Sequence, residues 1–278
     1  MAEPLIVLDR LSHVFSTRSG QTKAVDDVSL ELEPGKVLCL VGESGSGKTT
    51  TARIAAGLTK PTGGAVRFQG ADIHRLTGDR FTEFRRAVQY IHQDPYASLN
   101  PVRDVFTTLA APLRRHRVVR GRAQARQRAV ELLSEVDLTP PENFLRKFPH
   151  QLSGGQRQRV AVARALTLGP RLIIADEATS MLDVSIRISL LNVLQRLRDD
   201  LGVAFLFITH DLALAKYFGW HGTTAVMHQG RIVESGPTPQ VIDNPAHEYT
   251  KALLAAIPVP DPDLARRRAA RPRLPPPE

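Results

Sequence analysis

The sequence predicts an α/β fold with a mostly parallel sheet, and three observations support this prediction. The apolar stretch Val37–Val41 runs directly into the glycine-rich residues 42–49, which is typical of a strand that turns into a loop and a helix. Strand and helix patterns then alternate, as they do when crossover helices connect parallel strands. Over about 105–147 the alternation stops and only helical periodicity remains, which indicates an inserted helical block.

The elements are expected from local patterns along the chain. The clearest helix covers 123–136, where Ala125, Ala129, Leu132, Leu133 and Val136 share one face. In chain order, we expect a helix over 48–56, strands over 65–68 and 88–91, helices over 123–136 and 157–168, a strand over 172–175, a helix over 184–197, a strand over 203–208, a helix over 212–218 and a hairpin over 223–234 with glycine in its turn.

Composition narrows the class of protein. The chain has 278 residues, of which 42% are hydrophobic, enough for one large globular domain with an inserted subdomain. The longest apolar runs fall well short of the ~18 residues that span a membrane, and the N-terminus lacks a basic and then apolar signal pattern. We therefore expect neither a membrane-spanning nor an exported chain. The single cysteine, Cys39, leaves no disulfide or multi-cysteine metal site and fits a reducing cytoplasm.

The charge balance is basic. Lys and Arg number 37 against 28 Asp and Glu, a net charge of +9, which by itself would suggest nucleic acid or an anionic membrane as partner. Much of the excess lies in 114–128, which fits the solvated face of helices, and in a tail rich in Pro and Arg. We expect 261–278 to be disordered and to aid association with anionic lipid rather than to take part in the chemistry.

Residues 42–49 read GESGSGKT and match the phosphate-loop pattern GxxxxGK[ST]. Glycines let backbone N–H groups close around an anion, and the N-terminus of the following helix adds partial positive charge. Lys48 would reach the β- and γ-phosphates, and Thr49 would hold Mg²⁺. The residues expected around the phosphates are Gly42, Glu43, Ser44, Gly45, Ser46, Gly47, Lys48, Thr49 and Thr50.

Two further candidates stand at the ends of predicted strands, where open α/β sheets bind ligands. Asp176 and Glu177 directly follow the strand at 172–175; Asp176 suits Mg²⁺, and Glu177 suits a general base. His210 follows the strand at 203–208. The alternatives are that the acids only cap the next helix and that the histidine is structural.

A further candidate site is the segment from Ser153 to Gln156. Ser153 with Gln156 three residues on is a capping box, so the plainest interpretation is a well-capped helix start. That interpretation leaves Gly154 and Gly155 unexplained, because each glycine in a helix costs ~1 kcal/mol relative to alanine. Bare N–H groups that must approach a phosphate would explain them.

In their order along the chain, these motifs resemble the nucleotide-binding subunit of an ATP-binding cassette (ABC) transporter. The residues that carry the resemblance, over about 4–260, are 42–49, Gln93, the LSGGQ signature at 152–156, 172–177, 180–183 and His210. The resemblance implies a P-loop NTPase core with a mostly parallel sheet, an antiparallel β subdomain and a helical subdomain inserted at about 96–163.

Two segments, 93–101 and 244–258, look like the dipeptide, oligopeptide and nickel importer group. Three features depart from the family pattern: Glu248 stands where Pro is common, Met181 replaces a usual Ala at the dimer seam, and a Cys-rich C-terminal extension is absent, so no iron–sulfur site is expected.

The resemblance also implies roles for these residues. Two cassettes would dimerise head to tail, with each ATP between the phosphate loop of one and the signature of the other. Glu177 would activate water, Gln93 would sense nucleotide and touch Mg²⁺ or water, and His210 would contact the γ-phosphate. Asp183 would lie near the nucleotide. Phe15, placed before the first strand pair, would stack on adenine, with a core or edge phenylalanine as the alternative.

The implied partners are a second ATPase subunit, identical or related, two transmembrane permease subunits and, through the complex, an extracytoplasmic substrate-binding protein. The chain would sit at the cytoplasmic face of the membrane, and nucleic acid is not expected as a partner. Two alternatives remain open: an ABC-type ATPase that acts on nucleic acid or ribosomes, and a subunit that has lost hydrolysis. The complete set of Lys48, Gln93, Asp176, Glu177 and His210 argues against the second.

Overall fold

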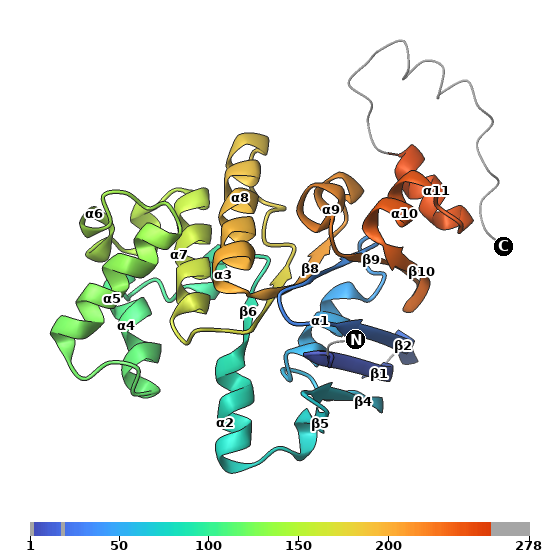
Figure 1. The fold of residues 1–278 in the computed structure, drawn as a ribbon, viewed down its shortest axis with the longest axis horizontal. Helices are drawn as coiled ribbons and strands as arrows, with labels where there is room; N and C mark the ends of the chain where they lie inside the picture. The colour runs from blue at the N-terminus through green and yellow to red at the C-terminus, as the bar shows by residue number, and fades with distance from the viewer. Residues whose placement is uncertain (1–2, 18–19, 257–278) are drawn as a thin grey trace, which may run out of the picture.

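The structure is a computed structural model that describes residues 3–17 and 20–256, and Figure 1 shows its arrangement. The predicted basic tail, 261–278, lies outside the described residues. The strands are β1 (Ile6–Thr17), β2 (Gly20–Leu32), β3 (Val37–Val41), β4 (Gly63–Phe68), β5 (Ala71–Asp72), β6 (Val88–Ile91), β7 (Leu172–Asp176), β8 (Ala204–Thr209), β9 (Thr223–His228) and β10 (Arg231–Pro237). The helices are α1 (Lys48–Ala55), α2 (Gly78–Ala87), α3 (Pro95–Ser98), α4 (Val105–Arg115), α5 (Arg122–Glu135), α6 (Glu142–Leu145), α7 (Gly154–Leu166), α8 (Val184–Leu201), α9 (Leu212–Gly219), α10 (Thr238–Asp243) and α11 (Glu248–Ala255).

A six-stranded sheet forms the centre of the molecule, in the order β10-β9-β3-β8-β7-β6. The five strands from β9 to β6 pair in parallel, and only β10 runs antiparallel to its neighbour. Both faces of β3 are buried: Val37, Cys39 and Val41 join one core cluster, while Leu38 and Leu40 join the other. A strand buried on both faces needs an unbroken apolar run, which is why VLCLV lacks the alternation of a half-exposed strand. The predicted mostly parallel sheet is confirmed.

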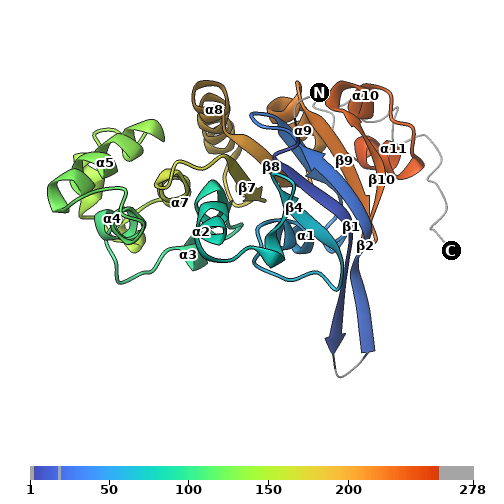
Figure 2. The ribbon, with the colours of Figure 1, turned by 60° about the horizontal axis from the view of Figure 1, so that its bottom comes forward.

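The second sheet is antiparallel, in the order β2-β1-β4-β5. Its apolar face packs toward the central sheet around α1, in the cluster that includes Leu11, Val28, Val66 and Ile54. Figure 2 shows the long hairpin of β1 and β2 extending away from the rest of the molecule. This sheet is the antiparallel β subdomain that the family resemblance implies, and the predicted fold class is confirmed.

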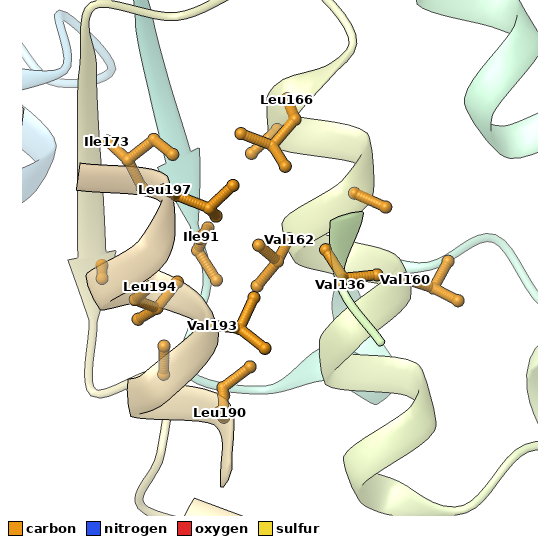
Figure 3. Close-up of a cluster of buried hydrophobic side chains, with 14 of the residues drawn as sticks. Ile91, Val136, Val160, Val162, Leu166, Ile173, Leu190, Val193, Leu194 and Leu197 are labelled. Carbon is orange, nitrogen blue, oxygen red and sulfur yellow. The ribbon is translucent and has the colours of Figure 1, made fainter. Parts of the chain in front are cut away.

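Between β6 and β7 the chain forms helices α3 to α7 and no strand. Figure 1 shows α4, α5 and α6 together at one end of the molecule, with α7 between them and the sheet. The face predicted for the 123–136 helix is buried, as all five of its apolar residues have exposed fractions of 0%. Figure 3 shows how this block joins the core: Val162 and Leu166 of α7 face Val193 and Leu197 of α8.

Several predicted boundaries need correction. Helix α7 begins at Gly154 rather than at 157, because the cap at Ser153 outweighs the low helix propensity of two glycines. Helix α8 continues to Leu201 rather than 197 and ends where Gly202 adopts a left-handed φ of 65°. None of the helices in residues 3–17 and 20–256 is both long and apolar enough to cross a membrane.

Candidate active site

Most of the predicted functional residues gather at one edge of the central sheet. The strands β3, β8, β7 and β6 are neighbours and parallel, so their carboxyl ends meet there. A cleft of about 840 Å³ opens at this edge. Of the predicted residues, those that line it are Glu43, Ser44, Gly45, Gly47, Lys48, Thr49, Thr50, Gln93, Glu177 and His210.

The glycine loop between β3 and α1 lies tight against other parts of the backbone. A Cβ atom on Gly42 would lie 2.1 Å from the carbonyl oxygen of Met227. Gly47 has a φ of 106°, and a Cβ there would lie 2.2 Å from the carbonyl oxygen of Ala24. No other residue fits at either position without moving the backbone. The loop is therefore held in one shape by β2 and β9.

Lys48 is buried at the centre of this loop. Its Nζ donates hydrogen bonds to the carbonyl oxygens of Gly42 at 2.8 Å and Glu43 at 2.7 Å. Burial lowers the pKa of the Lys48 ammonium, and the nearby carboxylates of Glu177 and Asp176 oppose this shift. A buried cation beside loop N–H groups is suited to binding an anion such as a phosphate group.

Asp176 ends β7 and is 3% exposed. Its carboxylate accepts hydrogen bonds from Thr49 Oγ1 at 3.1 Å and from Tyr90 Oη at 2.6 Å. Burial raises the pKa of the Asp176 carboxyl, against the effect of these hydrogen bonds. A buried carboxylate 3.1 Å from a threonine hydroxyl offers the hard oxygen ligands that Mg²⁺ prefers. Sequence reasoning missed Tyr90, because only the pairing of β6 with β7 brings it to Asp176.

Three of the predicted residues lie around the carboxylate of Glu177. Its Oε2 accepts a hydrogen bond from Gln93 Nε2 at 3.0 Å and lies 3.5 Å from Nδ1 of His210, while Oε1 lies 4.0 Å from Nζ of Lys48. The backbone of Glu177 has a φ of 45°, which is uncommon for any residue but glycine, asparagine or aspartate. The hydrogen bond from its N–H to the carbonyl of Ile208 helps to hold it there. Backbone strain of this kind is concentrated at functional sites.

The segment from Ser153 to Gln156 does not reach this cleft. It lines a separate surface hollow together with the start of α8. The predicted capping box is confirmed: Ser153 Oγ accepts from the backbone N–H of Gln156 at 3.2 Å, and Gln156 Oε1 accepts from that of Ser153 at 3.1 Å. Within one chain, the phosphate loop and this segment therefore form two different surfaces.

The structure gives a packing reason for only one of the two glycines of this segment. A Cβ on Gly155 would lie 2.6 Å from Cγ2 of Ile186 in α8, so close helix packing explains this glycine without any ligand. A Cβ on Gly154 would lie 4.0 Å from Leu182, an ordinary contact. Packing within the chain therefore accounts for Gly155 but not for Gly154, and the phosphate contact expected for this segment stays a prediction.

This difference predicts opposite effects of alanine on folding. Gly154→Ala should leave the free energy of unfolding unchanged or raise it by up to ~1 kcal/mol, because alanine is the better helix former. Gly155→Ala should lower it by ~1–2 kcal/mol, because Ile186 must move out of a packed position. Chemical unfolding of the two variants beside wild type measures both effects. Equal stabilities would contradict the packing explanation.

The remaining candidate residues do not line the cleft. Phe15 lies within β1 rather than before the first strand pair; it is 45% exposed and packs edge-to-face against His13, which excludes the core alternative. It does not line the cleft. Ser46 is buried in the glycine loop, with no partner for its hydroxyl among the described residues. Asp183 is exposed before α8, and its side chain does not cap that helix. Met181 is 58% exposed.

Two family models match the chain. Residues 25–180 match the model described as ABC transporter, and 25–180 covers more than half of the chain. The chain belongs to the ABC transporter family. The resemblance read from the motifs is confirmed. Residues 233–278 of this ABC protein match a second model, described as the C-terminal region of oligopeptide/dipeptide transporters.

Curated relatives agree with this assignment. The oligopeptide transport ATP-binding protein OppF of Bacillus subtilis is 44% identical over 269 residues, which cover 96% of this ABC protein and 87% of OppF. The glutathione import ATP-binding protein GsiA of Escherichia coli is 45% identical over 271 residues, which cover 95% of this chain and 43% of GsiA. The chain therefore spans less than half the length of GsiA.

Solved ABC cassettes share the fold. A dimeric structure of the ATP-binding cassette MJ0796 in a post-hydrolysis state, bound to ADP and Pi, superposes with a TM-score of 0.74 at 30% identity, covering 84% of this chain and 98% of that one. The structure of cbiO1 from Clostridium perfringens gives a TM-score of 0.74 at 24% identity, covering 87% and 92%. The arrangement of two sheets and a helical block is thus that of an ABC cassette.

Proposed function

We propose that this chain is the ATP-binding and ATP-hydrolysing subunit that energises an ABC importer for peptides or a related small solute such as nickel. The observation that carries the proposal is the environment of Glu177, whose carboxylate lies in the cleft beside Gln93, His210 and the buried Lys48. The oligopeptide and glutathione importers named among the relatives, and the match of 233–278, support peptides as the cargo class.

The proposed chemistry follows from these positions. Lys48 and the loop N–H groups bind the β- and γ-phosphates, which releases Lys48 from the carbonyls it now contacts. Glu177 orients the attacking water and accepts its proton. Gln93 holds the other side of that water, and His210 contacts the γ-phosphate. Exposed Phe15 offers an aromatic face to adenine.

The residues fit Mg²⁺ as the accompanying metal. Thr49 and Asp176 would hold it, since their oxygens already converge. Bound there, Mg²⁺ supplies neutralisation of the charge that develops on the phosphates. No cluster of three His, Cys, Asp or Glu side chains that could hold a metal exists in the described part of the chain. Water and phosphate oxygens would therefore complete the coordination, as is usual for Mg²⁺.

A second cassette would complete each site. Ser153 lines a hollow apart from the cleft, and Gly154 does not line the cleft, which supports a role for both at the nucleotide of a partner chain. The unexplained glycine at 154 leaves its backbone open to such an approach. Exposed Met181 and Asp183 precede α8, next to that surface, and would lie at the seam between the two cassettes. The partner is either identical or a related chain.

A groove of about 700 Å³ between α2, β6, α4 and α7 is the proposed docking site for a permease. It borders the helical subdomain, for which we propose the limits 96–163. Four arginines line it, Arg85, Arg103, Arg115 and Arg164, and none of the described residues that line it is Asp or Glu. Burial and neighbouring arginines lower the pKa of His116 in the same groove. The docking segment of the permease should therefore be acidic.

Reversing one of these charges should weaken docking. Arg103→Glu is expected to lower the yield of complex with the permeases several-fold at low salt while leaving ATP binding by the free chain unchanged, because Arg103 lies in the groove and not in the cleft. Arg126→Glu, an exposed charge reversal on α5 outside the groove, is the matched control. Pull-down of the two permeases at several salt concentrations measures the effect. Equal losses in both variants would contradict the groove as the docking site.

Co-purification tests the proposed function against its alternative. Expressed in its native host, the chain should co-purify with two permeases in the membrane fraction, as a peripheral subunit at the cytoplasmic face. Recovery with RNA, DNA or ribosomes instead would favour the alternative ATPase class, which the importer relatives do not support. The basic tail stays a prediction: removal of 261–278 should weaken salt-sensitive binding to anionic vesicles without changing hydrolysis.

A further inference from the structure

Helix α11 reaches the glycine loop at the cleft. Leu253 and Ala256 line the large cleft, and the hydroxyl of Tyr249 accepts a hydrogen bond of 3.2 Å from the backbone N–H of Glu43. Glu43 and Tyr249 are 206 positions apart in the sequence. Helix α11 belongs to the region that matches the oligopeptide/dipeptide C-terminal model, whereas the loop belongs to the general ABC model. One side chain thus connects the two regions at the phosphate loop.

Tyr249 and Lys48 hold the same peptide group from opposite directions. The peptide between residues 42 and 43 carries the carbonyl of Gly42 and the N–H of Glu43, which point in opposite directions in a trans peptide. Lys48 Nζ donates to this carbonyl at 2.8 Å, and Tyr249 Oη accepts from this N–H. Once Lys48 turns to a phosphate, its bond to the Gly42 carbonyl is lost. The Tyr249 bond is then the one of the two that still fixes the orientation of the peptide.

Tyr249 is itself held in place before any ligand arrives. Its ring packs on that of His228, the last residue of β9, with 4.0 Å between the ring centroids. Glu234 accepts hydrogen bonds from the backbone N–H groups of Ala246 and His247, which fixes the turn before α11, and His247 Nδ1 accepts from the N–H of Tyr249. Residues beside β9 thus hold the phenol in position, so the contact with the loop costs little ordering on binding.

The bond does not serve to satisfy a buried donor. Glu43 is exposed, so water could replace the phenol as the partner of its N–H. Burial raises the pKa of the Tyr249 hydroxyl, so the phenol stays neutral and keeps a proton that it can donate in turn. Water could make this hydrogen bond, but a side chain that is already in position makes it instead. The bond therefore orients the peptide of Glu43 rather than supplying a partner for a buried donor.

We infer that Tyr249 is a positioning residue for ATP binding, which fixes the first peptide of the phosphate loop and makes α11 part of the nucleotide site. The inference rests on the proposed function of the cleft. Without the phenol, the peptide at 42–43 becomes free to reorient when Lys48 leaves it, and ATP must pay the cost of ordering it. The loss should therefore appear in ATP affinity and not in the rate at saturating ATP.

The test compares two tyrosine hydroxyls in the full-length chain. Tyr249→Phe removes only the bond to the loop. Tyr217→Phe, the matched control, removes a phenol bond of 2.6 Å from α9 to Asn192 of α8, and neither residue lines the cleft. We expect Tyr249→Phe to raise the dissociation constant and the KM for ATP by about 2–10-fold, the range of one ordinary hydrogen bond, with kcat within 2-fold of wild type. Tyr217→Phe should change neither constant, and thermal unfolding should show both variants folded.

The outcomes separate this inference from the proposed function. A wild-type chain that binds no ATP would overturn both. If wild type binds ATP and Tyr249→Phe has the same dissociation constant and KM, the positioning role fails and the proposed function stands. A fall in kcat at unchanged KM would also overturn the inference, because a residue that only shapes the empty loop cannot act on the chemical step alone.

Discussion

Glu177→Gln is expected to lower the rate of ATP hydrolysis by ~10²–10⁴-fold, the usual contribution of a general base, while ATP binding persists. The amide keeps the size of the carboxylate and can still pair with Gln93 and His210, but it cannot accept a proton from water. ATP should then remain in the cleft and hold two cassettes together. Phosphate release gives the rate, and size-exclusion chromatography with bound-nucleotide analysis detects the trapped dimer.

Asp211→Asn is the matched control for this prediction. Asp211 lines the same cleft and caps α9 through the N–H of Ala213, and asparagine caps a helix about as well as aspartate. The control makes the same chemical exchange without removing the proposed base, so its rate should stay within a few-fold of wild type. Hydrolysis by Glu177→Gln within a few-fold of wild type would remove Glu177 from its role. Loss of ATP binding would show that the exchange disturbed the site itself.

Ser153→Asp should separate a helix cap from a ligand of the partner's nucleotide. Aspartate caps as well as serine, so the free energy of unfolding should change by only ~0.5 kcal/mol. In the closed dimer, however, the new carboxylate would face the γ-phosphate of the partner's ATP. ATP-driven dimerisation and hydrolysis should therefore collapse, while ATP binding to the single chain, whose cleft Ser153 does not line, should remain.

An Asp-to-Ser substitution at another helix N-cap measures how much the exchange of capping residues alone changes the free energy of unfolding. Asp104 caps α4 by accepting from the N–H of Thr107 at 2.7 Å, so Asp104→Ser reports the effect of exchanging these two capping residues. Chemical unfolding of both variants and ATPase assays on Ser153→Asp complete the comparison. A Ser153→Asp chain with normal activity and normal unfolding would leave Ser153 as a helix cap and nothing more.

Local patterns predicted the parts of the fold whose signal lies within a few residues. The run Val37–Val41 is an unbroken apolar stretch and the loop after it is rich in glycine, and the structure places both as predicted. Strands β1 and β2 were not predicted as elements. Four of the first five residues of β2 are polar or glycine and exposed, and its buried and exposed residues alternate only from Val28 onward. The antiparallel sheet followed from the family resemblance instead.

Some residues of the candidate site could likewise be predicted from local sequence patterns, and others could not. Strand-end placement was enough to expect Asp176, Glu177 and His210 near the phosphate loop, because parallel neighbours share an edge. Tyr90 and Tyr249 were missed, since their contacts depend on strand order and on the return of the C-terminal helix to the loop. The packing reason for Gly155 was missed for a similar reason: the Ile186 side chain that excludes a Cβ lies on another helix.

The central claim is that this cleft hydrolyses ATP to drive import, and phosphate release by the assembled transporter tests it most directly. The wild-type chain, reconstituted in vesicles with the proposed partners, two permeases and a second cassette, should release phosphate from ATP in a saturable, Mg²⁺-dependent manner. The rate should rise when the cargo-loaded binding protein is added. A complete assembly that binds ATP and releases no phosphate, with or without cargo, would contradict the account.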